Sequence, residues 1–201
     1  MLILGIDPGT AITGYGLVRG EPLGPYVLVE CGVIRTQARD PLAARLLEIY
    51  DGVREIVARH GPAALAVEDV FFGKNVRTTV ALGHARGVVL LAGEQADIPI
   101  HEYSPASVKK GVVGTGAATK EQVQFMVARL LRLKAAPSPA DAADGVAVAL
   151  CCLMEGPRLT RGKGVSTLDA GRRNATMGLL SAHAAAAALA ADGGAGRRAP
   201  R

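Results

Sequence analysis

Three consecutive strand patterns occupy the first 36 residues, and they limit the chain to folds that begin with an antiparallel meander. The patterns cover residues 1–7, 12–19 and 26–36. Pro8-Gly9-Thr10 forms the first turn signal, and a second connection rich in Gly and Pro precedes the third strand. We therefore expect three neighbouring strands of one sheet at the start of the chain.

Helix and strand patterns alternate after this meander. Asp40 is expected to cap a helix that ends at Gly61-Pro62, and Thr119 with Gln122 predicts a capping box for a later helix. The expected elements are helices over about 41–60, 76–95, 120–131 and 137–154, and strands over 64–68 and 99–103. This order predicts an α/β fold in which a mixed five-stranded sheet is flanked by helices.

Composition excludes several classes of protein. Hydrophobic residues make up 49% of the chain and charged residues 20%, which is typical of a globular chain. No apolar run approaches the roughly 18 residues needed to span a bilayer, and no signal-peptide pattern precedes the first strand. Cys31, Cys151 and Cys152 fit neither a disulfide framework nor a zinc site. We therefore expect a soluble protein of a reducing compartment that is neither secreted nor a membrane protein.

Basic charge is concentrated in two parts of the chain, which favours a polyanionic partner. Residues 157–201 carry eight Lys or Arg against two Asp, and residues 71–134 carry nine basic against four acidic side chains. The C-terminal stretch also loses the hydrophobic patterning. We predict a folded domain over residues 1–156 and a basic, disordered tail over residues 157–201.

Four acidic residues occupy positions where the surrounding pattern is apolar. Asp7 and Glu68 end apolar strands, whereas Asp141 and Asp144 share one face near the start of a helix that is apolar all round. Between residues 135 and 157 no Lys, Arg or His is available to pair with them. Buried carboxylates require a partner charge or a metal, and an oxygen-only donor set suits Mg²⁺ or Mn²⁺. Two such ions roughly 4 Å apart would stabilise the attacking and leaving oxygens of a phosphoryl displacement.

Three of these carboxylates also have a purely structural explanation. Asp141 follows Ser138 by three residues and suits a capping box. Asp7 suits the turn before Pro-Gly, and Glu68 suits an ordinary strand end. Asp144 lies too far inside the helix to cap it. One metal site accounts for all four positions at once, so we favour it.

Four stretches of the sequence carry a resemblance to a known family. They are LGIDPGTAITGYG, AVEDVFFGKN, KKGVVGTGAATKEQVQ and PADAADGVAVA, in that order along the chain. With these motifs the chain resembles the RuvC family of bacterial Holliday-junction resolvases, which belongs to the ribonuclease-H-like superfamily. The resemblance implies a ribonuclease-H-like fold over about residues 1–155 and does not extend into the C-terminal stretch.

The resemblance also implies roles for individual residues. The family's acidic quartet falls on Asp7, Glu68, Asp141 and Asp144, and some members carry histidine at the third of these positions. The family's two active-site lysines correspond to Lys109 and Lys120, which would neutralise phosphate charge or stabilise a transition-state oxyanion. Without the resemblance, either lysine is equally well a solvated side chain on a loop or in a first helical turn.

An aromatic residue lies at the opened centre of the junction in the family, and Phe71 matches it. An aromatic side chain on a loop can stack on an unpaired base, whereas the neighbouring Phe72 is expected in the core. The residues expected to contact DNA are Phe71, Lys74, Asn75, Arg77, Lys109, Lys110 and Lys120.

The activity that the resemblance implies is metal-dependent, structure-specific cleavage of DNA in recombination and repair. Such an endonuclease nicks two strands of like polarity symmetrically at a four-way junction and leaves 5′-phosphate and 3′-hydroxyl ends. It uses Mg²⁺, with two ions per active site, and Mn²⁺ can substitute. The resemblance further implies a homodimer that cooperates with the RuvA–RuvB branch-migration complex in the bacterial cytoplasm, in association with the nucleoid.

The helix expected over residues 76–95 contains small residues at helical spacing. Ala81 with Ala85, and Gly83 with Gly87, would allow close approach of a second helix, which makes this helix a candidate dimer interface. The same residues would equally let the helix lie close against its own sheet.

Two other functions match parts of the sequence. The stretch from Asp7 to Thr10 resembles the first phosphate loop of the actin–hexokinase class of phosphotransferases. Those proteins need two such domains around a nucleotide, and 201 residues with no second phosphate loop do not supply both. A non-catalytic junction-binding protein would not need all four carboxylates and both lysines.

Overall fold

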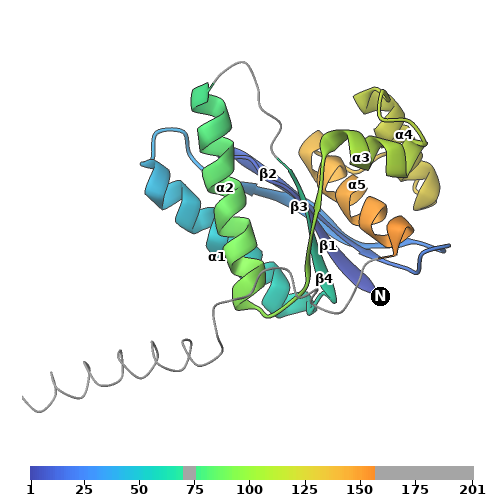
Figure 1. Ribbon diagram of the computed structural model, residues 1–201, viewed down its shortest axis with the longest axis horizontal. Coiled ribbons are helices and arrows are strands. Elements are labelled where there is room, and N and C mark those ends of the chain that lie inside the picture. Colours follow the sequence, from blue (N-terminus) through green and yellow to red (C-terminus); the bar gives the residue numbers. More distant parts are fainter. Residues whose placement is uncertain (70–75, 157–201) are drawn as a thin grey trace, which may run out of the picture. The chain divides into compact units, whose positions relative to one another are not determined.

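The computed structural model describes residues 1–69 and 76–156, which form a five-stranded sheet with helices on both faces (Figure 1). The strands are β1 (Leu2–Asp7), β2 (Ile12–Arg19), β3 (Val27–Arg35), β4 (Ala64–Glu68) and β5 (Ile100–Tyr103). Their order across the sheet is β3-β2-β1-β4-β5. The five predicted strands and the mixed sheet are therefore confirmed.

The central strand β1 has neighbours of both orientations. It runs antiparallel to β2, which is antiparallel to β3, so the first three strands form the predicted meander. It runs parallel to β4, which is parallel to β5. Because β1 and β4 are parallel, their carboxyl ends meet at the same edge of the sheet. Asp7 and Glu68 are the last residues of these two strands.

Two helical layers cover the sheet (Figure 1). One layer consists of α1 (Leu42–His60) and α2 (Val76–Gln95), and the other of α3 (Pro105–Val113), α4 (Lys120–Leu130) and α5 (Ala140–Glu155). Each layer packs against one face of the sheet and forms a separate hydrophobic core with it. In α5 every residue from Gly145 to Leu153 is buried, which confirms the prediction of a buried helix.

Helix α3 was not among the elements predicted from the sequence. Ser104 is its N-cap and accepts a hydrogen bond from the backbone N–H of Ser107 at 3.1 Å. Pro105 occupies the first helical position, and Gly114 ends the helix in the left-handed conformation at φ 91°. These are ordinary helix signals, so the sequence contained enough information to place this element.

Two expectations about helix caps have opposite outcomes. The capping box of α4 is confirmed, because Thr119 and Gln122 each accept a hydrogen bond from the other's backbone N–H. The expected cap of α1 by Asp40 is wrong. The first helical hydrogen bond runs from the N–H of Arg45 to the carbonyl of Pro41, so Pro41 is the N-cap and offers no side-chain acceptor.

Several predictions concern residues outside the described ranges. These are the tail over residues 157–201 and the placements of Phe71, Phe72, Lys74 and Asn75. Within the described ranges, no helix is both long enough and apolar enough to cross a membrane. All three cysteines are free, and Cys151 and Cys152 are buried in α5.

Candidate active site

Strand pairing brings Asp7 and Glu68 together. The residues just before them, Ile6 and Val67, are partners in the parallel ladder between β1 and β4. Both carboxylates therefore project from the carboxyl edge of adjacent strands, where side chains are no longer enclosed by the core. Each is largely but not completely buried.

Close packing of α5 on the sheet brings the two aspartates of α5 to the same edge. Gly14 of β2 lies opposite Asp7 in the antiparallel ladder. A Cβ at position 14 would overlap the carbonyl oxygen of Asp141, so only glycine lets the start of α5 lie this close to β2. One turn further along, a Cβ at Gly145 would stand 2.6 Å from the Cα of Tyr15.

Asp141 does not form the capping box that was its structural alternative. The N-cap of α5 is Pro139, and no side chain makes a cap hydrogen bond there. Asp141 instead lies near enough to Asp7 to raise the pKa of that carboxyl. It lies in the first turn of α5, next to the site but not among the residues that line its cavity.

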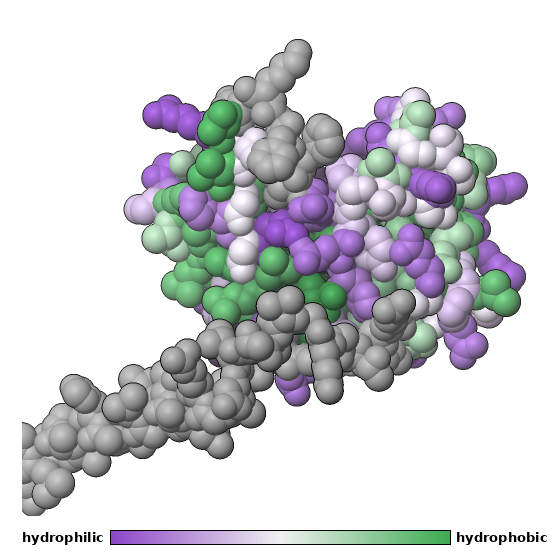
Figure 2. All heavy atoms as spheres, in the orientation of Figure 1, coloured by the Kyte–Doolittle hydropathy of each residue, from purple (hydrophilic) through white to green (hydrophobic). Residues whose placement is uncertain are grey.

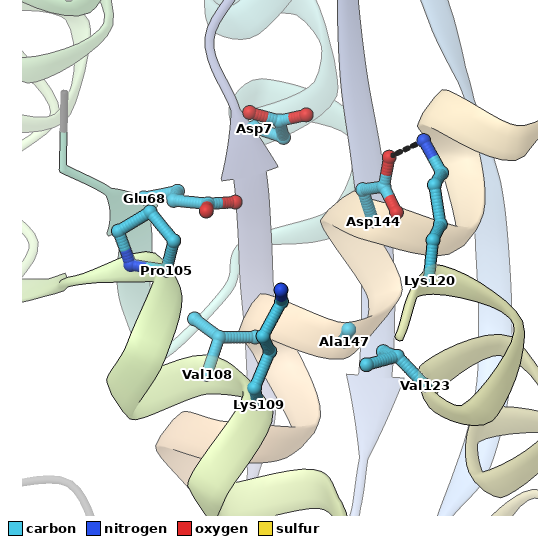
Figure 3. Close-up of a pocket in the computed structure, with 9 residues that line it drawn as sticks. All are labelled: Asp7, Glu68, Pro105, Val108, Lys109, Lys120, Val123, Asp144 and Ala147. Atoms are coloured by element: carbon cyan, nitrogen blue, oxygen red, sulfur yellow. Dashed lines mark hydrogen bonds and ion pairs between the residues drawn. The ribbon is translucent and has the colours of Figure 1, made fainter. Parts of the chain in front are cut away.

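A cavity of about 250 Å³ opens between the sheet edge and the helices α3, α4 and α5 (Figure 3). The residues that line it are Asp7, Glu68, Pro105, Val108, Lys109, Lys120, Val123, Asp144 and Ala147. Three of the four predicted carboxylates and both predicted active-site lysines are thus brought together. Lys109 comes from the helix that the sequence analysis missed, not from a loop.

The sequence around Asp144 contains no basic residue, and in the folded protein Lys120 of α4 supplies a positive charge beside it. Its Nζ donates a hydrogen bond to Oδ2 of Asp144 at 2.7 Å (Figure 3). This contact raises the pKa of Lys120 above its usual value, so the amino group stays charged. The side chain of Lys109 points into the same space from α3 (Figure 3).

Burial and mutual repulsion disfavour the ionised forms of two carboxyls. Burial, together with the charges of Asp144 and Asp141, raises the pKa of Asp7 to about 6. Burial and the charges of Asp7 and Asp144 raise the pKa of Glu68 to about 8, against the opposing effect of both lysines. Carboxylates held this close need added positive charge to ionise together.

The donor set fits a hard divalent cation, although the side chains are not arranged around a single point. In the described part of the chain, no group of three or more His, Cys, Asp or Glu side chains is positioned to hold a metal as it stands. The four candidates nevertheless offer oxygen donors only, the preference of Mg²⁺ and Mn²⁺. A cation among them would relieve the repulsion that raises the pKa of Asp7 and Glu68.

Neighbouring charged residues lie away from the cavity. The carboxylate of Asp69 pairs with Nη2 of Arg86 on α2 at 3.4 Å. Lys110 is exposed in the last turn of α3 and Arg77 is exposed in the first turn of α2. Neither of these two predicted DNA-binding residues lines the cavity.

The apolar wall of the cavity was also not predicted from the sequence. Val108 and Val123 are buried, and with Pro105 and Ala147 they close its inner side. Helical spacing marks Val123 as a core residue, but no local signal shows that either valine borders a site.

The fold and the site define a ribonuclease-H-like α/β protein whose carboxylates gather at the carboxyl edge of two parallel strands. A family model described as "Crossover junction endodeoxyribonuclease RuvC" matches residues 3–152. The chain belongs to the RuvC family. The resemblance noted in the sequence is therefore confirmed.

Relatives of the same description cover most of this chain. The one from Desulforamulus reducens is 51% identical over 152 residues, which is 75% of this chain and 92% of the relative. The one from Moorella thermoacetica is 50% identical over 167 residues, which is 83% of this chain and 99% of the relative.

Solved structures agree with the family assignment. Thermus thermophilus RuvC is 37% identical with a TM-score of 0.71, and the match covers 77% of this chain and 94% of that one. T. thermophilus RuvC in complex with a Holliday junction substrate gives 36% identity and a TM-score of 0.74, with the same coverage. The yeast mitochondrial Holliday junction resolvase, at 12% identity and a TM-score of 0.55, shares the fold alone.

Proposed function

We propose that this chain is a metal-dependent endonuclease that resolves Holliday junctions by nicking two strands of like polarity. The observation that carries the proposal is the convergence of Asp7, Glu68 and Asp144 with Lys109 and Lys120 around one cavity. The similar T. thermophilus protein bound to a Holliday junction substrate supports four-way junction DNA as the partner.

The four carboxylates would hold two Mg²⁺ ions per active site, and Mn²⁺ could substitute for Mg²⁺. When bound, the ions supply activation of a water and charge neutralisation at the scissile phosphate. Asp7 interacts with all three of the other carboxylates, because the charges of Asp144 and Asp141 raise its pKa and its own charge raises that of Glu68, so we propose it as a ligand shared by both ions.

The two lysines would have different roles at the phosphate. Lys120 holds Asp144 through its 2.7 Å hydrogen bond and keeps that carboxylate aimed at the site. Lys109 projects its ammonium group into the cavity, where it would bind a non-bridging phosphate oxygen as negative charge develops (Figure 3). Cleavage would leave a 5′-phosphate and a 3′-hydroxyl.

The remaining DNA contacts would lie around the mouth of the site. Lys110 and Arg77 are exposed and free of the core, which suits phosphate contacts. The proposed base-stacking residue Phe71, with Lys74 and Asn75, belongs to the segment between the described ranges.

A homodimer through the outer face of α2 would give two symmetric sites. A Cβ built at Gly83 or Gly87 meets no atom within 4 Å, so both glycines face outward and not toward the sheet. Val76, Val80 and Leu91 are also exposed on this helix. Figure 2 shows hydrophobic residues near both ends of α2 and pale, small residues between them. This favours the dimer interpretation for the two glycines, whereas Ala85 is buried against the protein's own core.

The cellular setting follows from the same proposal. A resolvase of this family would work in the bacterial cytoplasm on nucleoid DNA, together with the RuvA–RuvB branch-migration complex, and would have no membrane partner.

Cleavage of a synthetic mobile four-way junction tests the function against a matched linear duplex. The protein is assayed with Mg²⁺, with EDTA, and as the Glu68→Gln variant. Paired symmetric nicks on the junction only, lost in both controls, are the expected result. Junction binding without cleavage in any divalent metal would support a non-catalytic protein instead. Indifference to DNA combined with binding of ATP would support the phosphotransferase alternative.

A further inference from the structure

Two arginines of the α1–α2 layer contact residues that follow Asp7 and Glu68 at the carboxyl ends of β1 and β4. Arg45 lies near the start of α1 and Arg86 in the middle of α2. Neither lines the cavity. We propose that they are positioning residues, with Arg45 fixing the turn that follows Asp7 and Arg86 fixing the strand end that carries Glu68. The inference rests on the carboxylate site proposed above.

Arg45 and Thr36 together hold the carbonyl oxygen of Thr10. Nη2 of Arg45 donates to this oxygen at 2.5 Å, and the hydroxyl of Thr36 donates to it at 2.5 Å. Nε of Arg45 donates to the same Thr36 hydroxyl at 2.9 Å, which closes the arrangement. The planar guanidinium makes both contacts in a fixed geometry that a lysine does not reproduce.

The neighbouring carbonyl of the turn is held as well. The hydroxyl of Thr13, which is fully buried, donates to the carbonyl of Gly9 at 2.8 Å and accepts from the N–H of Gly9 at 3.3 Å. The carbonyls of Gly9 and Thr10 are therefore both fixed within three residues of Asp7. The backbone that aims the Asp7 side chain has little freedom left.

Arg86 makes an equivalent link beside Glu68. Its guanidinium forms ion pairs with Asp69, the residue after Glu68, and with Glu102 of β5. The backbone N–H of Asp69 donates to the carbonyl of Tyr103 at 2.8 Å, and Tyr103 is the ladder partner of Glu68. Arg86 thus ties the ends of β4 and β5 to α2.

The burial of Arg86 argues that this link has a purpose beyond ordinary surface pairing. The side chain is only 22% exposed, and its Nε is buried with no hydrogen-bond partner in the described part of the chain. Burying a guanidinium donor without a partner costs free energy. The strand ends that it joins hold Glu68 close to the like charges of Asp7 and Asp144, which oppose that arrangement.

Arg45→Met and a matched pair of Thr36 variants test the contacts of Arg45 at the turn after Asp7. Arg45→Met removes both guanidinium hydrogen bonds, to the Thr10 carbonyl and to the Thr36 hydroxyl, and we expect it to show the losses given below for Thr36→Val. Thr36→Val removes the hydroxyl at nearly constant shape, whereas Thr36→Ser keeps it. Three quantities are measured: the single-turnover rate of junction cleavage, the affinity for the junction in EDTA, and the rise in melting temperature on adding Mn²⁺. We expect Thr36→Val to cut the rate roughly tenfold to a hundredfold and to reduce the Mn²⁺-induced rise, with junction affinity within about twofold. Thr36→Ser should keep both the cleavage rate and the Mn²⁺-induced rise in melting temperature close to those of the wild type.

Arg86→Met and Arg86→Lys test the ion pairs of Arg86 in the same assays, and Arg54→Gln is the control. Arg54 is an exposed arginine of α1, and the contacts that it makes in the described ranges, with Asp51 and Tyr50, lie on its own helix. We expect Arg86→Met to lower the cleavage rate and the Mn²⁺-induced rise in melting temperature as Thr36→Val does. Arg86→Lys should recover part of both quantities, and Arg54→Gln should match the wild type.

The outcomes separate this inference from the proposed function. Folded Arg45→Met, Thr36→Val and Arg86→Met proteins that cleave and bind Mn²⁺ like the wild type would overturn the positioning role, as would a loss of melting temperature alone. Full activity of Glu68→Gln would instead overturn the carboxylate site itself. If Arg86→Met does not fold, the Thr36 pair and Arg86→Lys decide the question.

Discussion

Nζ of Lys120 lies 2.7 Å from Oδ2 of Asp144, which joins the first turn of α4 to the face of α5 that borders the cavity. The pair does more than hold two helices together. The charge of Lys120 also lowers the pKa of Asp7 and of Glu68, against burial and carboxylate repulsion that raise both. The charge of Asp141 also raises the pKa of Lys120, so this one lysine interacts with all four carboxylates.

Replacing Lys120 should impair the chemical step more than DNA binding. In Lys120→Met the Asp144 carboxylate loses its hydrogen bond, and Asp7 and Glu68 lose a neutralising charge. We expect the single-turnover cleavage rate to fall about a hundredfold. Lys110→Met is the matched control, because Lys110 is exposed and does not line the cavity. It should weaken junction affinity in a salt-dependent way and leave the rate at saturation unchanged. Equal rate losses in the two variants would contradict the assignment.

The metal-free protein should lose stability as pH rises from about 4 to about 8. The pKa of Asp7 is raised from 3.8 to about 6 and that of Glu68 from 4.5 to about 8. In this window the folded state therefore binds more protons than the unfolded state, and the free energy of unfolding falls with pH. Melting temperatures in EDTA across this range measure the effect.

Glu68→Gln is the control for the pH dependence. The variant has no proton to lose at position 68, so its melting temperature should fall less steeply between about pH 5 and pH 8 and exceed that of the wild type at the upper end. Mg²⁺ or Mn²⁺ should stabilise the wild type most at high pH, because the metal binds ionised carboxylates. Parallel curves for the two proteins would show that Glu68 is not a proton-binding group of the folded state.

The close approach of α5 to β2 makes Gly14 sensitive to any side chain. A Cβ at this position would overlap the carbonyl oxygen of Asp141, which is backbone and has no rotamer to change. We expect Gly14→Ala to lower the free energy of unfolding by about 1–3 kcal/mol. Cleavage should also fall at temperatures where the variant is folded, because α5 must shift and carry its carboxylates away from Asp7. Denaturant unfolding and single-turnover cleavage check the two effects, and an unchanged rate would mean that Asp141 tolerates the displacement.

Local sequence signals predicted Asp7 and Glu68, because each carboxylate ends an apolar strand and strand patterns are visible in short windows. The ion pair of Asp144 could not be predicted in the same way. Its partner, Lys120, lies 24 residues away and reaches it only because α4 packs beside α5. The close contact of Gly14 with Asp141 depends likewise on how α5 lies on the sheet, since a glycine within a strand can equally mark a bulge or a bend.

The remaining errors concern where helices begin and end, and they have local causes. The predicted start of α1 was one residue too early, because Asp40 is a good capping residue and Pro41 a good first helical residue. In the structure Pro41 takes the N-cap position with ψ 144°. The helix α3 was missed although Ser104, Pro105 and Gly114 mark its ends, because its nine residues give only two turns of hydrophobic periodicity.

The outer face of α2 should control oligomeric state. Val80 is 53% exposed, and the neighbouring Gly83 leaves open space where a second helix could approach. In Val80→Glu a carboxylate would be buried unpaired at the interface, so the dimer dissociation constant should rise about a hundredfold or more. Phe125→Glu is the control, since Phe125 is 62% exposed on α4, in the other helical layer. Sedimentation equilibrium should show a monomer for Val80→Glu and a dimer for the control. The monomer should bind junctions weakly and lose paired nicking, because one site cuts one strand. A dimer that persists in Val80→Glu would place the interface on another surface.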